Sequence, residues 1–152
     1  MYTVGKMEGS VFVGVYRRKA QYHETDQMGI IHHSNYIRWF ESARIWYMSQ
    51  IGVDYRDMEQ QGIISPVLEV SCTYKSMVHF GDIVEIIPKI EKYNGIILEL
   101  SYLIQDQKTR EVRTCGKSRH CFLNRENKPI SLKKSCPTFH AAFQLAMEAE
   151  QR

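Results

Sequence analysis

A change in hydrophobic period at about residue 63 constrains the fold more than any other feature of the chain. Between Ser34 and Ile51 the apolar residues recur at steps of three and four, which predicts one long helix. Its apolar stripe and the residues that widen it are Tyr36, Phe40, Ala43, Tyr47 and Ile51, then Trp39, Trp46, Ile37 and Met48. After residue 63, apolar and polar residues alternate with the period of β-strands. Because so little of the helix surface is polar, we expect the strands to enclose it.

The remaining polar side of the long helix carries Glu41 and Arg44, which are three residues apart and so placed for an ion pair. Gly52 ends the helix. A short second helix is predicted from Asp54, as its N-cap, to just before Gly62. Both helices therefore precede the β-rich half of the chain.

Five β-strands are predicted around the long helix. They are expected at about residues 11–22, 68–74, 84–90, 98–104 and 112–123. The second of them alternates as a half-buried strand does, and Pro88 in the third indicates a sheet edge or a bulge. Asn94-Gly95 predicts a two-residue type I′ turn. Small residues in the last strand would let a helix or a ligand approach closely: Thr114, Gly116 and Ser118.

The order of these elements predicts an α+β fold. Four strands with short connections indicate an antiparallel meander, so the expected fold is an antiparallel five-stranded sheet wrapped around a long central helix. We expect residues 1–152 to form one domain, with residues 1–10 loosely ordered and about 137–150 forming a C-terminal helix. Since one helix leaves much of the sheet uncovered, we expect a homodimer or a homotetramer.

Composition excludes several classes of function. The formal net charge is +3, and 17 acids are interspersed among the 20 Lys and Arg residues, which is not the pattern of a nucleic-acid-binding protein. No apolar run approaches the roughly 20 residues of a membrane span. The four cysteines form no C-x-x-C pair, and no signal peptide is evident. These features predict a cytoplasmic protein with reduced, mostly buried thiols.

The stretch YHETDQMGIIHHSNYIRWF, residues 22–40, carries the candidate chemistry. A metal site is disfavoured, because His32 and His33 are adjacent and point apart on most backbones. A catalytic site is possible, because Asp26 lies in a loop, with Gly29 to make the turn, just before a helix whose first N–H groups lack partners. Those groups would stabilise a carbonyl oxygen that gains negative charge. Spacing alone favours a simpler role for Asp26 as a loop cap.

Residues 25–44, TDQMGIIHHSNYIRWFESAR, resemble the signature of the 4-hydroxybenzoyl-CoA thioesterase family of hotdog-fold acyl-CoA thioesterases. The matching residues are Thr25, Asp26, Gly29, His33, Asn35, Tyr36, Glu41, Ala43 and Arg44. Residues 66–82, PVLEVSCTYKSMVHFGD, resemble a second stretch of the family. The resemblance extends over about residues 15–123 and implies hydrolysis of an acyl-CoA thioester, or of an acyl-carrier-protein thioester, without a cofactor or a metal.

The resemblance also implies roles for individual residues. Asp26 would be the catalytic nucleophile or general base, the backbone N–H of His33 would polarise the thioester carbonyl, and Gly29 would shape the loop. Substrate contacts are expected from Thr25, His32, Asn35 and Tyr36. CoA phosphates would meet basic residues at the rim of the sheet, for which the candidates are Lys92, Lys117 and Arg119.

Three departures from the family pattern keep other functions open. His32 stands where an aromatic residue is usual, Met77 replaces a common proline and His79 a common arginine. A non-catalytic module that binds acyl-CoA or acyl-carrier protein is one alternative, although Asp26 argues against it. A hotdog hydratase or dehydratase, which would use an acid and a histidine, is the other, and His33 keeps it open.

Overall fold

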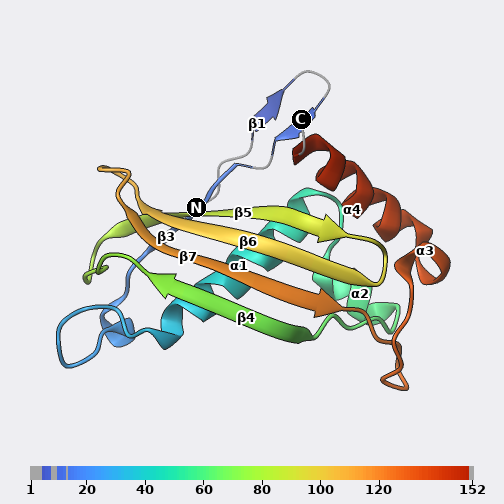
Figure 1. Cartoon of the computed structure of the whole chain (residues 1–152), viewed down its shortest axis with the longest axis horizontal. Helices are drawn as coiled ribbons and strands as arrows, with labels where there is room; N and C mark the ends of the chain where they lie inside the picture. Colours follow the sequence, from blue (N-terminus) through green and yellow to red (C-terminus); the bar gives the residue numbers. More distant parts are fainter. Residues whose placement is uncertain (1–4, 8–9, 13, 151–152) are drawn as a thin grey trace.

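A five-stranded antiparallel sheet curves around one long helix in the computed structural model, which describes residues 5–7, 10–12 and 14–150 (Figure 1). The strands are β3 (Tyr16–Lys19), β4 (Val67–Tyr74), β5 (Ile83–Tyr93), β6 (Ile97–Asp106) and β7 (Val112–Cys121). The helices are α1 (Ser34–Gln50), α2 (Tyr55–Gln60), α3 (Leu132–Ser135) and α4 (Pro137–Glu150), with a 3-10 turn η1 (Tyr22–Glu24). The predicted α+β architecture is confirmed.

The strand order is β3-β5-β6-β7-β4, so the expected meander of four consecutive strands is wrong in one place. Strands β5, β6 and β7 follow one another, but β4 pairs with β7 and not with β5. The reason is that β3 already occupies the other side of β5. Strand β4 is therefore an edge strand at the far side of the sheet from β3.

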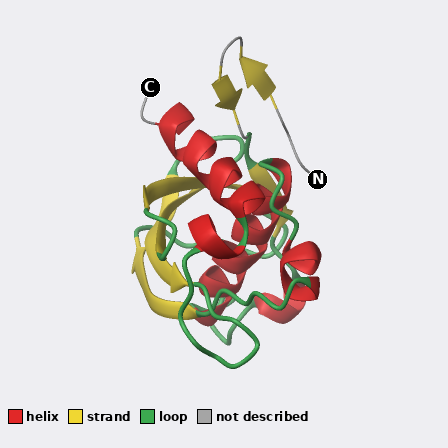
Figure 2. Ribbon diagram, turned by 90° about the vertical axis from the view of Figure 1, so that its right-hand side faces the viewer, coloured by secondary structure: helices red, strands yellow, loops and turns green. Residues whose placement is uncertain are grey.

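Helix α1 forms the core against the concave face of the sheet, and the view in Figure 2 shows the helices on one side of the strands. Phe40 stacks on Tyr102 of β6 with ring centroids 4.5 Å apart. A Cβ atom on Gly116 of β7 would lie 2.5 Å from Cζ of Phe40, so only glycine admits the helix here, and the predicted close approach is confirmed. Each large side chain buried in this way contributes about 1.5–3 kcal/mol. Ile37, by contrast, is 40% exposed.

One local expectation about the β5–β6 hairpin needs correction, and another holds in one of its two alternatives. Gly95 has a φ of +89°, but Asn94 does not have the positive φ that a type I′ turn requires. Asn94 instead accepts hydrogen bonds with its side chain from the N–H groups of Ile96 and Ile97. Pro88 lies outside the bulge, which falls between Ile90 and Lys92, but it does lie at a local edge of the sheet, which is one of the two predicted alternatives. It pairs with Tyr102 of β6, and β3 has already ended on its other side.

The ends of the chain differ in part from expectation. Gly5–Met7 and Ser10–Phe12 form a separate two-stranded sheet, β1 and β2, and the rest of residues 1–10 lies outside the described residues. The expected first strand therefore does not run unbroken from residue 11, since β3 begins at Tyr16. Helix α4 is confirmed, and it buries Phe139 and Phe143. None of the helices in the described part of the chain is long and apolar enough to span a membrane.

Strand β4 is more exposed than the half-buried strand that its alternation predicted. Val67, Leu68 and Tyr74 expose about half of their surface, at 53%, 49% and 47%. The reason is its position at the edge of the sheet, where β7 pairs with it on one side only. An edge strand with exposed apolar side chains is a ready surface for a further chain.

Candidate active site

The segment between η1 and α1 holds Asp26 in a tight loop at one end of the sheet (Figure 1). The Asp26 N–H donates to the Ile30 carbonyl at 2.9 Å, and the Asp26 carbonyl accepts from the Gly29 N–H at 3.1 Å. Oδ1 of Asp26 accepts from the Met28 N–H at 2.8 Å. Gly29 has a φ of +79°, a conformation that residues with side chains rarely adopt. The loop thus fixes the backbone of Asp26 while its carboxylate stays partly exposed.

His33 immediately precedes α1, and its backbone N–H has no acceptor among the residues that the structure describes. Its carbonyl accepts a hydrogen bond from the Tyr74 hydroxyl at 2.9 Å. The His33 ring stacks on His32 with centroids 4.1 Å apart. A free N–H at the positive end of a 17-residue helix is a good donor to an oxygen that gains negative charge.

The side chain of His32 caps the first turn of α1. Its Nδ1 accepts from the Ser34 N–H at 3.2 Å and lies 2.8 Å from the Ser34 hydroxyl oxygen. Both bonds are satisfied when Nδ1 is unprotonated and the proton is on Nε2. The His32 N–H donates to the Glu24 carbonyl at 2.9 Å. His32 therefore joins the loop to the helix start.

Glu24, which the sequence analysis did not single out, anchors this arrangement. Its buried carboxylate accepts from Trp39 Nε1 at 2.7 Å, Arg18 Nη2 at 2.9 Å and the Gln21 N–H at 2.9 Å. Burial opposes ionisation, but the hydrogen bonds from Trp39, Gln21 and Arg18 outweigh it and lower the pKa of Glu24. The carboxylate thus stays charged and links β3, η1 and α1. Gln21 and Glu24 form a capping box, whose three-residue spacing was the signal in the sequence.

Thr25 and Asn35, which were predicted to contact the substrate, use their polar side-chain groups in hydrogen bonds within the protein instead. The Thr25 hydroxyl donates to the Tyr22 carbonyl at 2.7 Å, and the Asn35 amide donates to the Glu24 carbonyl at 2.8 Å. Tyr36 is buried, which raises the pKa of its hydroxyl, and its ring lies 5.2 Å from that of Tyr74. These residues support the loop and the helix start around Asp26.

Comparison with known proteins decides the family. The family model described as "Thioesterase-like superfamily" matches residues 20–144. The chain belongs to this superfamily. The Bacillus subtilis (strain 168) protein YneP, which bears the name of an acyl-CoA thioesterase, is 36% identical over 129 residues, covering 84% of this chain and 93% of YneP. The structure of the Staphylococcus aureus DHNA-CoA thioesterase is 37% identical in sequence and superposes with a TM-score of 0.82. The match covers 86% of this chain and 87% of the Staphylococcus aureus chain.

A third relative from Aquifex aeolicus (strain VF5), named as an esterase, is 31% identical over 120 residues, covering 79% of this chain and 91% of its own. The predicted hotdog fold and the predicted enzyme class, a thioesterase, are confirmed by these matches. No group of three or more His, Cys, Asp or Glu side chains within the described ranges is arranged to hold a metal ion. All four cysteines are free thiols, of which Cys121 and Cys136 are buried and the other two partly exposed.

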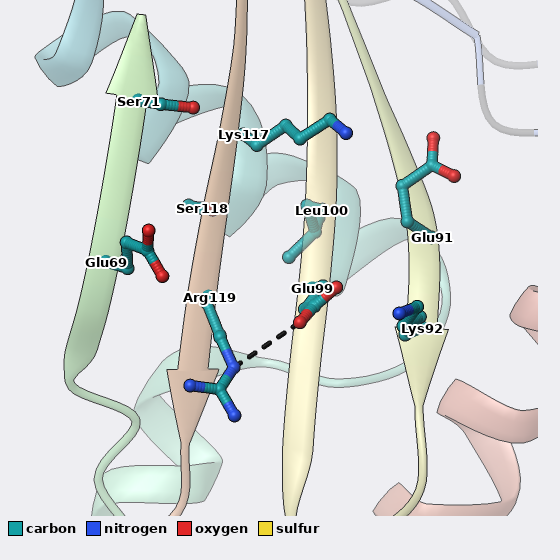
Figure 3. A pocket seen from close by; sticks show the side chains of 9 residues that line it. All are labelled: Glu69, Ser71, Glu91, Lys92, Glu99, Leu100, Lys117, Ser118 and Arg119. Atoms are coloured by element: carbon teal, nitrogen blue, oxygen red, sulfur yellow. Dashed lines mark ion pairs between the residues drawn. The ribbon is translucent and has the colours of Figure 1, made fainter.

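The three basic residues expected to bind CoA phosphates in this thioesterase come together on the outer face of the sheet, away from α1 (Figure 3). Lys92, Lys117 and Arg119 line a shallow hollow of about 280 Å³. The same hollow contains three carboxylates, those of Glu69, Glu91 and Glu99. Arg119 Nε lies 3.4 Å from Oε1 of Glu99. Within one chain this hollow is on the opposite face of the sheet from the start of α1.

Arg44 does not form the expected ion pair with Glu41. Its side chain is buried beneath α1, where Nη1 contacts both ring nitrogens of His120, with Nε2 at 3.0 Å. His120 Nε2 lies 2.7 Å from the Ser118 hydroxyl, which is 2.6 Å from that of Tyr102. Burial and the adjacent Arg44 charge lower the pKa of His120 to about 3, so its ring is neutral at pH 7. Glu41, in contrast, is exposed.

Proposed function

We propose that the chain hydrolyses acyl-CoA thioesters, with Asp26 and the His33 N–H as the catalytic groups. The observation that carries this proposal is the unpartnered His33 N–H at the start of α1, next to a loop that positions a partly exposed carboxylate. The names of YneP and of the Staphylococcus aureus enzyme, both above 35% identity, support an acyl-CoA as the substrate.

In the proposed reaction the thioester carbonyl oxygen accepts a hydrogen bond from the His33 N–H. As the carbonyl carbon becomes tetrahedral, the negative charge on this oxygen is stabilised by the N-terminal end of α1. Asp26 either attacks the carbon and forms a mixed anhydride that water then hydrolyses, or removes a proton from an attacking water molecule. The C–S bond breaks and its electron pair leaves with CoA as a thiolate. Because a thiolate is a good leaving group, no additional acid is needed.

We also propose that two copies associate through β4. This edge strand exposes the apolar side chains of Val67, Leu68 and Val70, and no other strand of the described residues pairs with its outer edge. Pairing with a second β4 would bury both features. In such a dimer, Lys92, Lys117 and Arg119 of one copy remain our proposed contacts for CoA phosphates, since the first two form no ion pair within residues 14–150. The free thiols support a cytoplasmic location.

The test is thiol release from a panel of acyl-CoA esters by the wild type, D26N and D57N. Asp57 is an exposed acid of α2 and makes D57N a matched control. We expect D26N to lower kcat by about 10²–10⁴-fold, the usual contribution of such a group, and D57N to retain wild-type activity. Folding of both variants is checked by their urea midpoints.

Failure of Asp26-dependent thiol release across the panel would reject hydrolysis. Tight binding of acyl-CoA without turnover would then identify a binding module. Hydration of an enoyl-CoA would identify a hydratase, and it is measured as the loss of absorbance of the conjugated thioester. Analytical ultracentrifugation tests the dimer, and a charged residue at Val70 (V70K) is expected to shift it toward monomer.

A further inference from the structure

Two loops at one end of the sheet expose large apolar side chains. Tyr22 and Met28 belong to the segment between β3 and α1, and Met77 and Phe80 belong to the segment between β4 and β5. These four side chains, which we call the loop patch, expose 76%, 74%, 57% and 58% of their surface. Both segments lie at the end of the sheet opposite α4 (Figure 1). A single exposed apolar residue is ordinary, but several in adjoining loops indicate a binding surface.

Hydrogen bonds and ring packing hold the two loops side by side. The Ile31 N–H, at the end of the first loop, donates to the Val78 carbonyl in the second at 2.8 Å. The ring of Tyr22 packs edge-on against that of Phe80, with centroids 5.6 Å apart. The loop patch is therefore one continuous surface, although its residues are more than 50 positions apart in the sequence.

Three exposed lysines surround the loop patch: Lys19, Lys75 and Lys108. Lys75 lies in the second loop itself. The N–H groups of the residues that follow Lys19 and precede Lys108 donate to the carbonyls of residues 82 and 83, at 2.8 and 3.0 Å. None of the three lysines forms an ion pair with an acid in the described ranges. The nearby arginines, in contrast, each pair with a carboxylate: Arg17, Arg18, Arg110 and Arg113.

The acids in these loops have contacts of their own. Oδ2 of Asp82 accepts from the His79 N–H at 2.9 Å, and Asp26 accepts from the Met28 N–H at 2.8 Å. Glu111, beyond the turn that carries Lys108, pairs with a neighbouring arginine. The lysine charges are therefore the ones available to a partner, so the surface is apolar at its centre and positive at its rim.

We propose that the loop patch binds the surface of an anionic lipid membrane. Side chains with an apolar ring and a polar tip, such as Tyr22, are enriched where membrane and water meet. Lysine is depleted in protein–protein interfaces, whereas each lysine near an anionic bilayer strengthens binding, so the rim fits lipid phosphates better than it fits a protein. This binding does not depend on the proposed hydrolysis, and it places the Asp26 loop at the membrane surface.

The test is co-sedimentation of the full chain with vesicles, in the absence of acyl-CoA. One set of vesicles contains phosphatidylcholine alone, and the other contains an equal mixture of phosphatidylcholine and phosphatidylglycerol. We expect binding to the mixed vesicles to be tighter by about tenfold or more. In about 1 M salt, where the Debye length is about 3 Å, it should fall to the level of the neutral vesicles.

Two variants remove the two components of the surface. Y22S/F80S should weaken binding to the mixed vesicles by about tenfold or more, because both rings lose their apolar contact with lipid. Its matched control is I96S/L145S, which removes two apolar side chains, 48% and 56% exposed, near the other end of the sheet. K19Q/K75Q/K108Q should weaken binding by about fivefold for each lysine. Its control has the same net charge and replaces exposed lysines elsewhere, as K128Q/K133Q/K134Q.

Both controls should bind as the wild type does, and urea midpoints show that each variant is folded. Equal binding of wild type and Y22S/F80S would overturn the proposal. So would an equal loss in the two lysine variants, because net charge alone would then explain binding. If a protein partner or a second copy covers the loop patch instead, the wild type would sediment with neither set of vesicles, which also overturns the proposal. None of these outcomes bears on Asp26-dependent thiol release, which is measured without vesicles.

Discussion

Replacing Glu24 by glutamine tests whether the charge of this buried carboxylate holds the active-site loop. Glutamine keeps the shape but loses the charge, and its NH₂ group must face one of the three donors from Trp39, Arg18 and Gln21. Hydrogen bonds to a charged group contribute about 1.5–3 kcal/mol each, and breaking a buried ion pair costs about 3–5 kcal/mol. Since part of the network survives in the variant, we expect E24Q to lower the free energy of unfolding by about 3 kcal/mol at pH 7.

The pH dependence distinguishes loss of charge from loss of packing. The folded protein lowers the pKa of Glu24 below its ordinary value of 4.5. The stabilisation by its charge is therefore complete above pH 4.5 and is lost as the pH falls through the lowered pKa. Urea unfolding of wild type and E24Q at pH 7 and at successively lower pH should show their difference shrinking in acid. Activity should also fall, by about tenfold in kcat/KM if the loop loses about 1.4 kcal/mol of positioning.

The control is E99Q, which removes a carboxylate from a partly exposed pair with Arg119. Such pairs contribute about 0–1 kcal/mol, so E99Q should unfold close to the wild-type midpoint. A difference between wild type and E24Q below about 0.5 kcal/mol, or one that stays constant from pH 7 into acid, would refute the role of the Glu24 charge.

Three further substitutions address other parts of the molecule. H32F removes the cap of α1 and should lower stability by about 1 kcal/mol in urea unfolding and reduce kcat more than it changes KM. G116V should destabilise by at least about 1–3 kcal/mol through its clash with Phe40, and the double variant with F40L should recover only part of this, because the Ser71 carbonyl is also 2.7 Å from the added Cβ. Burial raises the pKa of Glu150 to about 7, so wild type should lose stability relative to E150Q as pH rises from about 4.5 to 8.

Each of these three predictions would be contradicted by a specific outcome. Wild-type kinetics in H32F would show that the cap does not position the helix start. If F40L restored all of the stability that G116V loses, the steric clash would come from the Phe40 ring alone. A constant difference between wild type and E150Q across this pH range would show that Glu150 is ionised in the fold as it is in the unfolded chain.

The local pattern of the sequence was sufficient to predict the long helix and the short helix that follows it. The 3.6-residue period and Gly52 defined α1 to within a residue, and Asp54 caps α2 as its type predicts. These are properties of neighbouring residues, so they can be identified without knowing the rest of the fold. Asp26, Gly29 and His33 also lie in one short segment, but spacing alone favoured a loop cap for Asp26, and the catalytic roles came from the family resemblance and stay a proposal.

What the tertiary structure decided depends on residues far apart in the chain. The place of β4 beside β7 follows from the position that β3 takes on β5, which no local period encodes. Arg44 meets His120, 76 residues away, and not Glu41 three residues before it, because the helix turns that side chain into the core. Glu24 became an anchor only when three elements converged on it. The hydrophobic period and helix capping depend on neighbouring residues. Strand pairing and side-chain burial depend on which distant surfaces the folded chain brings into contact.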